Sequence, residues 1–369
     1  MIKVEEVKGI FDLIKFVNCE YEIKKGEKAF VPPIFLERFI TLKYSKFLKH
    51  GKAKLFIAKD GKQVVGRISA QIDYLYTKKE KAGFFGFFEC VNSYEVAEKL
   101  LSSAENFLKN EGMEKIMGPF SFNINGESGL LIQGFDEPPF VMMPFNPPYY
   151  VDLIEKNEYS KAKDLFAWKI TREDVEKKTS SLLKLIWKES EGKLKIREIT
   201  KKTLSEDISI AVDIFNDAWS ENWGFIPLTE EEGKKIARAL KIVLDSKIAF
   251  FCYADNEPAG VCIAVPNINE ALAGTSGGKN PLDFIKIFNR IKKIKSIRLI
   301  ILGVKKKFRK NYPFMPLFMV GELMKRGKER GYEKAELSWT LEDNDRINKI
   351  ISISGAQKYK IYRIYQKKI

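Results

Sequence analysis

The stretch LGVKKKFRKNYPFMPLFMVGELMKRGKERGYEKAELSWTLEDN, residues 302–344, decides the fold class. It starts at the end of an apolar run, crosses a basic turn, and then carries apolar residues at helical spacing over about 315–330. Gly331 is typical of a glycine that ends a helix, and KAELSW (334–339) is typical of a short buried strand. The order of strand, basic loop, helix and strand predicts an α/β unit with a mixed sheet.

Three segments of the first half recur in the second half in the same order, which predicts two copies of one fold. Each copy begins with two strands joined by a hairpin turn and ends with a strand. The paired segments are 55–70 with 250–265, 109–125 with 328–344, and 159–170 with 356–368.

The repeat defines the expected domains as residues 1–170 and 195–369, joined by a connecting helix over 171–194. Thr171 with Asp174 three positions later indicates the N-terminal cap of that helix. In the first copy, the apolar spacing over 94–111 predicts an amphipathic helix that buries one face.

Composition excludes several classes of function. The 369 residues include four cysteines without a Cys-x-x-Cys pair and one histidine, so we expect no metal site and no disulfide framework. His50 ends a helical pattern before a glycine, which favours a structural role over a His–Asp catalytic pair. No apolar run has the length of a membrane helix, and the N-terminus lacks a signal-peptide pattern, so we expect a cytoplasmic protein with no membrane partner.

The net charge is +15, from 64 Lys and Arg against 49 Asp and Glu, which favours an anionic partner: a nucleic acid, an anionic membrane surface or a polyphosphate ligand. The densest cluster of one sign is KKKFRK, residues 305–310, inside the stretch quoted above. Elsewhere both signs alternate, as is typical of solvated faces. We therefore expect no nucleic acid partner, with tRNA as the one exception that the charge leaves open.

In its order of elements, the second half resembles the GCN5-related N-acetyltransferases (GNAT) over most of 195–369. The first half resembles the same superfamily more faintly. The phrases GPFSFNINGESGLL (118–131) and MMPFNPPYY (142–150) resemble a bacterial group of tandem GNAT-like proteins. The resemblance implies two tandem acyl-CoA N-acyltransferase folds and acetyl-CoA or another acyl-CoA as co-substrate.

By this resemblance, the cofactor arm would pair with the backbone at the end of one central strand, and its pyrophosphate would lie on the next loop. Asn344 would contact the arm, or would simply cap the following helix. The loop departs from the family pattern, because Tyr312 and Phe314 stand where the family has glycines and Pro313 removes a backbone donor. Neighbouring lysines would then hold phosphates by charge, or form a solvated turn. The implied cofactor residues are Leu302, Gly303, Val304, Arg309, Lys310, Asn311, Tyr312 and Asn344.

Acyl transfer to an amine requires a base and an acid. Glu336 is the candidate base by its position on a strand, with a solvent-facing charge as the alternative. The family's usual acid, a tyrosine, is replaced here by Ile351, which leaves Tyr359 and Tyr362 as substitutes. The corresponding loop of the first copy has neither glycine nor a basic residue, so we expect that copy to bind no cofactor.

The acceptor candidates come from two segments. Glu221, Asn222 and Trp223 follow the first helix of the second copy, and Tyr149 lies in a segment of the first copy rich in aromatic residues and proline. That segment is alternatively a packed linker. The predicted function is an acyl-CoA-dependent N-acyltransferase acting on a small amine or an amino-acid-like acceptor. The alternatives are an aminoacyl-tRNA-dependent transferase of the peptidoglycan-bridge type and a non-catalytic ligand-binding protein.

Overall fold

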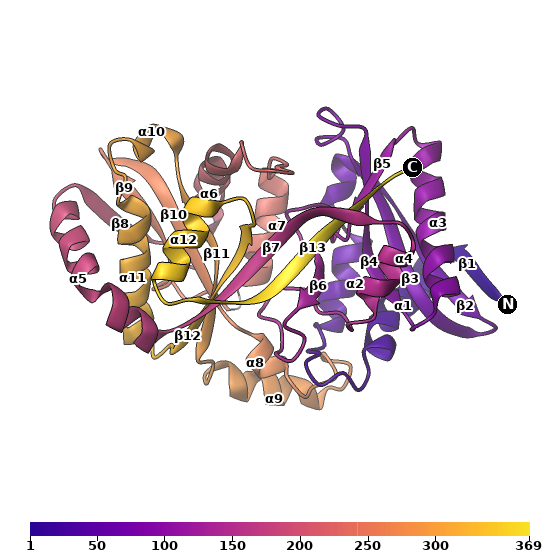
Figure 1. Cartoon of the computed structure of the whole chain (residues 1–369). Coiled ribbons are helices and arrows are strands. Elements are labelled where there is room, and N and C mark those ends of the chain that lie inside the picture. Colours follow the sequence, from indigo (N-terminus) through magenta and orange to yellow (C-terminus); the bar gives the residue numbers. More distant parts are fainter. Residues whose placement is uncertain (242) are drawn as a thin grey trace. The chain divides into compact units, whose positions relative to one another are not determined.

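The computed structural model describes residues 1–241 and 243–369, which form two compact units (Figure 1). Unit 1 consists of Met1–Leu165, Asn269–Ile291 and Lys360–Ile369, and unit 2 of Phe166–Ile268 and Lys292–Tyr359. Both units are discontinuous in sequence. The repeat gives the order of elements along the chain, whereas each spatial unit borrows part of the other repeat.

Unit 1 is a sheet in the order β1-β2-β3-β4-β5-β13, with β6 pairing β13, and it has helices on both faces. The strands are β1 (Ile2–Glu6), β2 (Gly51–Asp60), β3 (Gln63–Asp73), β4 (Ala82–Cys90), β5 (Lys115–Gly118) and β6 (Leu130–Gln133), with parts of β7 (Ser160–Thr171) and β13 (Gln357–Lys368). The helices are α1 (Gly9–Ile23), α2 (Phe35–Lys43), the short 3-10 helix η1 (Lys46–Lys49), α3 (Tyr94–Asn110), α4 (Tyr150–Lys156), α8 (Asn269–Leu272) and α9 (Leu282–Ile291).

Helix α3 covers one face of this sheet, as its spacing predicts. Ser93 caps it by accepting a hydrogen bond from the Val96 amide, and Gly112 follows it with a φ of 80°. The apolar residues expected on one face are all buried: Val96, Ala97, Leu100, Leu101, Ala104, Phe107 and Leu108. They pack against the alternate residues Ile68, Ala70 and Ile72 of β3.

The last ten residues of the chain complete unit 1. On β13, Tyr365 pairs with Gly118 of β5 and Arg363 pairs with Leu130 of β6. Ile364 and Tyr365 are fully buried, and the Arg363 guanidinium donates to both carboxylate oxygens of Asp164, at 2.8 and 3.1 Å. Unit 1 therefore requires the C-terminus of the chain for its central sheet.

A chain that ends at Tyr359 is expected to lose the fold of unit 1, at a cost of more than about 5 kcal/mol, because β5 and β6 lose their shared partner strand. Hydrogen exchange of α3 measures this loss. Gln366→Ala, a half-exposed position on the same strand, is the control and should leave α3 protected. Unchanged protection of α3 in the truncated chain would refute this role of β13.

Unit 2 is a sheet in the order β7-β12-β11-β10-β9-β8. Its strands are β8 (Leu194–Glu198), β9 (Ala249–Ala254), β10 (Glu257–Pro266), β11 (Ser296–Val304) and β12 (Lys334–Leu341), with the second part of β7 and the start of β13. Its helices are α5 (Arg172–Ser190), α6 (Leu204–Trp219), α7 (Glu230–Leu240), α10 (Lys306–Arg309), α11 (Met315–Glu329) and α12 (Asp345–Ile353).

Two apolar clusters sandwich the sheet of unit 2. On one face, Met315, Phe318 and Met319 of α11 pack on Cys262 and Ala264 of β10. On the other face, Ile214 of α6 packs on Val261 of β10, with Ile263 and Ile301 beside it. The predicted helix after the first copy is α5, and Thr171 caps it by accepting from the Asp174 amide at 3.2 Å.

The described residues contain no helix that is both long and apolar enough to cross a membrane. They also contain no group of His, Cys, Asp and Glu side chains arranged to hold a metal ion. The four cysteines are buried thiols, and burial raises the pKa of Cys90 to about 12.

Candidate active site

The two central strands of unit 2 diverge. The parallel ladder between β11 and β12 runs from Ser296 opposite Lys334 to Leu299 opposite Leu337. The ladder with β10 shifts register after Leu299, so Ile300 is an extra residue, and β11 continues to Val304 along β10. Among the described pairs, residues 300–304 of β11 thus have a partner strand on one side. An extended ligand can pair with the other side.

A cluster of four polar side chains lies at the point of divergence. Glu336 of β12 is fully buried, and it is the register partner of Arg298 on β11. The Ser338 hydroxyl donates to Glu336 Oε1 at 2.5 Å, and the Tyr359 hydroxyl of β13 donates to Glu336 Oε2. Arg298 Nε lies 3.5 Å from Glu336 Oε1 and donates to Ser338 Oγ at 2.7 Å. We call these four residues the Glu336 cluster.

Strand alternation places the Glu336 cluster on the face that α6 covers. Val261 and Ile263 of β10 face α6, so Val265 lies on the same side, and its register partner is Arg298. A buried carboxylate is tolerated where a cation and hydrogen-bond donors compensate its charge, as Arg298, Ser338 and Tyr359 do here. The arrangement holds a carboxylate in hydrogen-bond contact with a phenol, which is a pair that can exchange a proton.

The basic turn after β11 is paired with acidic side chains. Lys305 lies 2.5 Å from Asp213 and Lys306 lies 2.6 Å from Glu221, while Lys307 pairs with Glu257. Such pairs near the surface are worth at most about 1 kcal/mol each, so a polyphosphate could replace the carboxylates as partner. A ligand can therefore bind these lysines only by displacing the carboxylates that pair with them.

Three further residues of this turn have defined places. Arg309 donates to the carbonyls of Val304, at 3.0 Å, and Ala218, at 2.7 Å, so it ties the end of β11 to the end of α6. The Tyr312 hydroxyl donates to Asp255 at 2.7 Å, in the turn between β9 and β10. Lys310 and Asn311 are exposed at the tip of the turn.

The remaining cofactor candidates lie at the end of β11 and at the start of α12. Leu302, Gly303 and Val304 form its last residues, and a Cβ on Gly303 would lie 2.3 Å from the Trp219 ring of α6. Asn344 caps α12 and accepts from the Ile347 amide at 3.4 Å. The structure therefore shows the capping role for its side chain.

The acceptor candidates fall in different units. Glu221, Asn222 and Trp223 follow α6, and Glu221 approaches the turn after β11 through its pair with Lys306. Tyr149 belongs to unit 1, where its hydroxyl donates to the Cys90 carbonyl at 2.9 Å. The structure thus places Glu221 beside the basic turn, whereas the Tyr149 hydroxyl forms a hydrogen bond within unit 1.

In unit 1, the corresponding strands are β4 and β5, and other segments of the chain bind the backbone of β4 where the two strands separate. β4 and β5 pair only from Ala82 to Phe84, and the Phe120 amide then donates to the Phe85 carbonyl at 2.8 Å. At the end of β4, the Cys90 amide donates to the Tyr150 hydroxyl at 2.9 Å, and Tyr149 holds the Cys90 carbonyl. Of the two units, unit 2 has the more open strand end.

Comparison with known proteins identifies the fold and the family. No model of a known protein family matches the chain. It is 35% identical to a bacterial ceramide synthase of Caulobacter vibrioides, over 99% of this chain and 97% of that protein. It is also 35% identical to the protein YghO of Escherichia coli, over 97% of this chain and 93% of that protein. A tandem GNAT protein from the clavulanic acid biosynthesis pathway matches in structure, with a TM-score of 0.58 at 9% identity over 100% of this chain and 98% of that one.

The chain belongs to the family of these two relatives, and its fold is that of tandem GNAT proteins. The predicted fold class and the predicted resemblance to tandem GNAT proteins are therefore confirmed. Both relatives match over nearly their whole length, so the similarity covers both units of this chain.

The GNAT unit 1 contains a buried charge network that the repeat did not reveal. Arg67 of β3 is 1% exposed, and it donates to the Phe16 carbonyl at 2.9 Å and to Glu20 at 2.8 Å. Lys24 bridges Glu20, at 3.4 Å, and Glu89, at 2.7 Å. The signal was present in β3, where the alternate residues that face away from α3 are polar: Arg67, Ser69, Gln71 and Asp73.

The two acids of this network respond differently to it. Burial alone would raise the pKa of Glu20, but Lys24, Arg38 and Arg67 outweigh burial and hold it well below its usual value of 4.5. For Glu89, burial prevails and raises the pKa. Glu20 is thus the acid whose ionised form the native GNAT fold stabilises.

Acidification is therefore expected to remove the contribution of Glu20 to stability. A lowered native pKa gives stability that is complete above the unfolded value of 4.5 and is lost as the pH falls below it. Glu20→Gln should lower the free energy of unfolding at neutral pH, and its difference from wild type should shrink towards about pH 3. Urea unfolding at several pH values measures this. A constant difference across that range would contradict the assignment.

The single histidine does have an acidic partner. His50 ends the 3-10 helix η1, as its structural interpretation predicts, but its Nδ1 lies 3.3 Å from Asp73 Oδ1. Asp73 is fully buried, and it also accepts from Asn123 Nδ2 at 2.8 Å and from the Leu75 amide at 2.9 Å. The sequence did not reveal this contact, because Asp73 lies on another element, at the end of β3.

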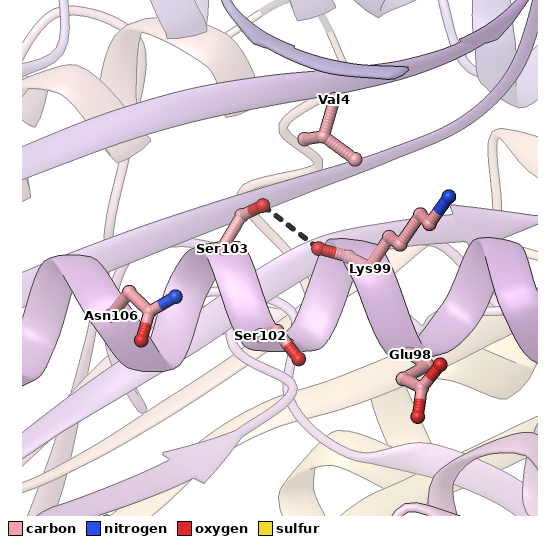
Figure 2. A pocket seen from close by; sticks show the side chains of 6 residues that line it. All are labelled: Val4, Glu98, Lys99, Ser102, Ser103 and Asn106. Carbon is pink, nitrogen blue, oxygen red and sulfur yellow. Dashed lines mark hydrogen bonds between the residues drawn. The ribbon is translucent and has the colours of Figure 1, made fainter. Parts of the chain in front are cut away.

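A shallow groove of unit 1 lies between β1 and α3, away from the residues above. Figure 2 shows its lining of Val4 and α3 side chains, with Ser103 donating to the Lys99 carbonyl at 2.8 Å. The Lys99 ammonium donates to the Ile2 carbonyl at 3.1 Å and pairs with Glu95 at 2.8 Å. These polar groups satisfy one another, so the groove contributes to the seam between β1 and α3.

Proposed function

We propose that this chain is an acyl-CoA-dependent N-acyltransferase whose reaction takes place in unit 2. The observation that carries the proposal is the Glu336 cluster at the divergence of β11 and β12. The free side of 300–304 would pair with the extended arm of an acyl-CoA, and the thioester would then lie near the buried carboxylate. The resident groups supply both a base and an acid.

The proposed proton path uses Glu336 and Tyr359. The amine nitrogen forms a bond to the thioester carbon, the bond from that carbon to sulfur breaks, and one amine proton passes to Glu336. The Tyr359 hydroxyl gives its proton to the leaving thiolate, and the proton on Glu336 then crosses their hydrogen bond to Tyr359. Amine and acyl-CoA thus become amide and free CoA, and both side chains return to their starting state.

Arg298 and Ser338 act in this proposal as positioning residues. Arg298 donates to Ser338, which in turn donates to Glu336, so the carboxylate has one fixed orientation within the sheet. Ile351 occupies the place of the family's usual acid and has no proton to give. Tyr359 reaches the base from β13 instead.

The acceptor that we propose is a long-chain amine. The Caulobacter relative carries the name ceramide synthase, and a ceramide is the amide of a long-chain amino alcohol and a fatty acid. The same class of reaction, amide formation from an acyl-CoA, fits the Glu336 cluster. The paired lysines of the turn after β11 give little net field for a tRNA-borne donor, so the tRNA alternative ranks lower.

The test is a transfer assay with purified protein. Acetyl-CoA and a fatty acyl-CoA are each offered with a long-chain amino alcohol, a short amine and an amino acid. Amide is detected by mass spectrometry, and free CoA by its thiol. We expect amide and thiol in equal amounts with the fatty acyl-CoA and the long-chain amino alcohol. Thiol release without amide would refute the proposal, because it indicates thioester hydrolysis. No product from any pair would also refute it and would favour a non-catalytic ligand-binding protein.

A further inference from the structure

Helix α9 of unit 1 exposes an apolar stripe to solvent. It belongs to the insertion 269–291. This insertion lies between β10 and β11 in the sequence but is part of unit 1, whereas both strands are part of unit 2. Its buried side consists of Asp283 and Ile287. Four large apolar residues lie on its exposed side: Leu282 at 59%, Phe284 at 52%, Ile285 at 61% and Phe288 at 67% exposure.

The polar residues of the exposed side are neutral or cationic. They are Lys286, Asn289 and Arg290, and the helix's one acid, Asp283, is buried. All residues of α9 are described, so its solvent-facing side carries no carboxylate. Lys279, just before the helix, is a further cation and lies 3.9 Å from the centre of the Tyr21 ring. An apolar stripe bordered by cations is typical of helices that lie in the headgroup region of anionic membranes.

The helix is held rigidly in this presentation. Asp283 Oδ2 accepts from the Ser276 amide at 2.7 Å and from the Ser276 hydroxyl at 2.5 Å. Arg290 donates to the Ala273 carbonyl at 2.7 Å, which closes the other end of the helix onto the segment after α8. The Gly277 carbonyl accepts from the Phe35 amide at 2.9 Å, which fixes the insertion to the start of α2. The stripe therefore needs no folding step before it binds.

We propose that α9 docks unit 1 on the surface of an anionic phospholipid bilayer. A second copy of the chain is the less suitable occupant, because a two-fold contact through α9 would place the same cations opposite one another. The inference deepens the proposed function, since a long-chain amine acceptor resides in a bilayer. It differs from the sequence-based expectation of no membrane partner, which concerned spanning helices.

The experiment is co-sedimentation of the full chain with vesicles, without substrates. One set contains phosphatidylcholine alone, and the other contains phosphatidylcholine and phosphatidylglycerol in equal parts. Wild type should bind the mixed vesicles and not the neutral ones. The double variant Phe284→Asp/Phe288→Asp should bind at least about tenfold more weakly, and Lys286→Glu about fivefold more weakly. Ile353→Asp, at a 66% exposed apolar position of α12, is the matched control and should bind like wild type.

Three outcomes would overturn the proposal. They are no binding to mixed vesicles, equal binding to both vesicle types, and binding that the double variant at α9 retains. Sedimentation velocity adds a check, because a dimer that this double variant dissociates, without vesicle binding, would assign the stripe to a second copy. Vesicle binding needs no catalysis, so a failed transfer assay with intact vesicle binding would refute the proposed function alone.

Discussion

Glu336→Gln is expected to lower kcat for amide formation by about 10²–10⁴-fold, the usual contribution of a general base. The amide of glutamine has nearly the shape of the carboxylate but cannot take the amine proton. The substitution leaves the apolar packing of β12 unchanged, because Glu336 shares its face with Arg298 and Ser338 rather than with α11. KM for the acyl-CoA should change little, since the co-substrate is expected to pair with the β11 backbone.

Two further variants make this result specific. Glu333→Gln, three positions before the base, changes a half-exposed acid that pairs with Lys295 at 3.2 Å, and it should keep wild-type activity. Tyr359→Phe removes the proposed acid and should also lower kcat, but it leaves the carboxylate in place. If Glu336→Gln and Glu333→Gln retain equal activity while both remain folded, Glu336 is not the base.

Arg67→Met is expected to destabilise unit 1 by about 3–5 kcal/mol, the cost of removing one partner from a buried ion pair. Arg67 compensates Glu20, at 2.8 Å, and Glu89, at 3.4 Å, and its guanidinium lies 4.9 Å from the centre of the Phe16 ring. Methionine fills much of the same volume, so the loss isolates the charge. The remaining cations, Lys24 and Arg38, would then have to compensate two acids removed from water.

Urea unfolding measures this difference, with probes in unit 1 for Arg67→Met and probes in unit 2 for its control. Arg330→Met is the matched control, because Arg330 pairs with Asp245 at 2.9 Å while 55% of its side chain is exposed. That pair should be worth at most about 1 kcal/mol. A change at Arg67 no larger than the change at Arg330 would show that the buried network is not a source of stability.

The sequence predicts the parts of this fold that depend on local spacing. The helix over 94–111 and the cap at Thr171 follow from residues a few positions apart, and the structure confirms both. The side chain of a strand residue can face either side of the sheet. The register partner Arg298 was needed to assign Glu336 to one of these sides. Strand alternation alone cannot make that choice, because both faces of a central strand are covered.

Contacts between distant segments were beyond the sequence. The acidic partners of Lys305 and Lys306 lie on and just after α6, about ninety residues earlier. The sequence alone therefore gave no sign of these ion pairs. Tyr359 contacts Glu336 because β13 starts in unit 2, before its later residues pair with strands of unit 1. The insertion 269–291 sits in the second repeat but packs in unit 1, and no periodic pattern records such an assignment.

The central claim is that an acyl-CoA binds in unit 2, where β11 leaves β12. Hydrogen exchange with a thioether analogue of a fatty acyl-CoA, which binds but cannot transfer its chain, tests this most directly. We predict slower exchange of backbone amides in 300–311 when the analogue is added, and no change in 86–93, the matching strand end and loop of unit 1. Slower exchange in 86–93 alone, or unchanged exchange in both segments at saturating analogue, would contradict the assignment.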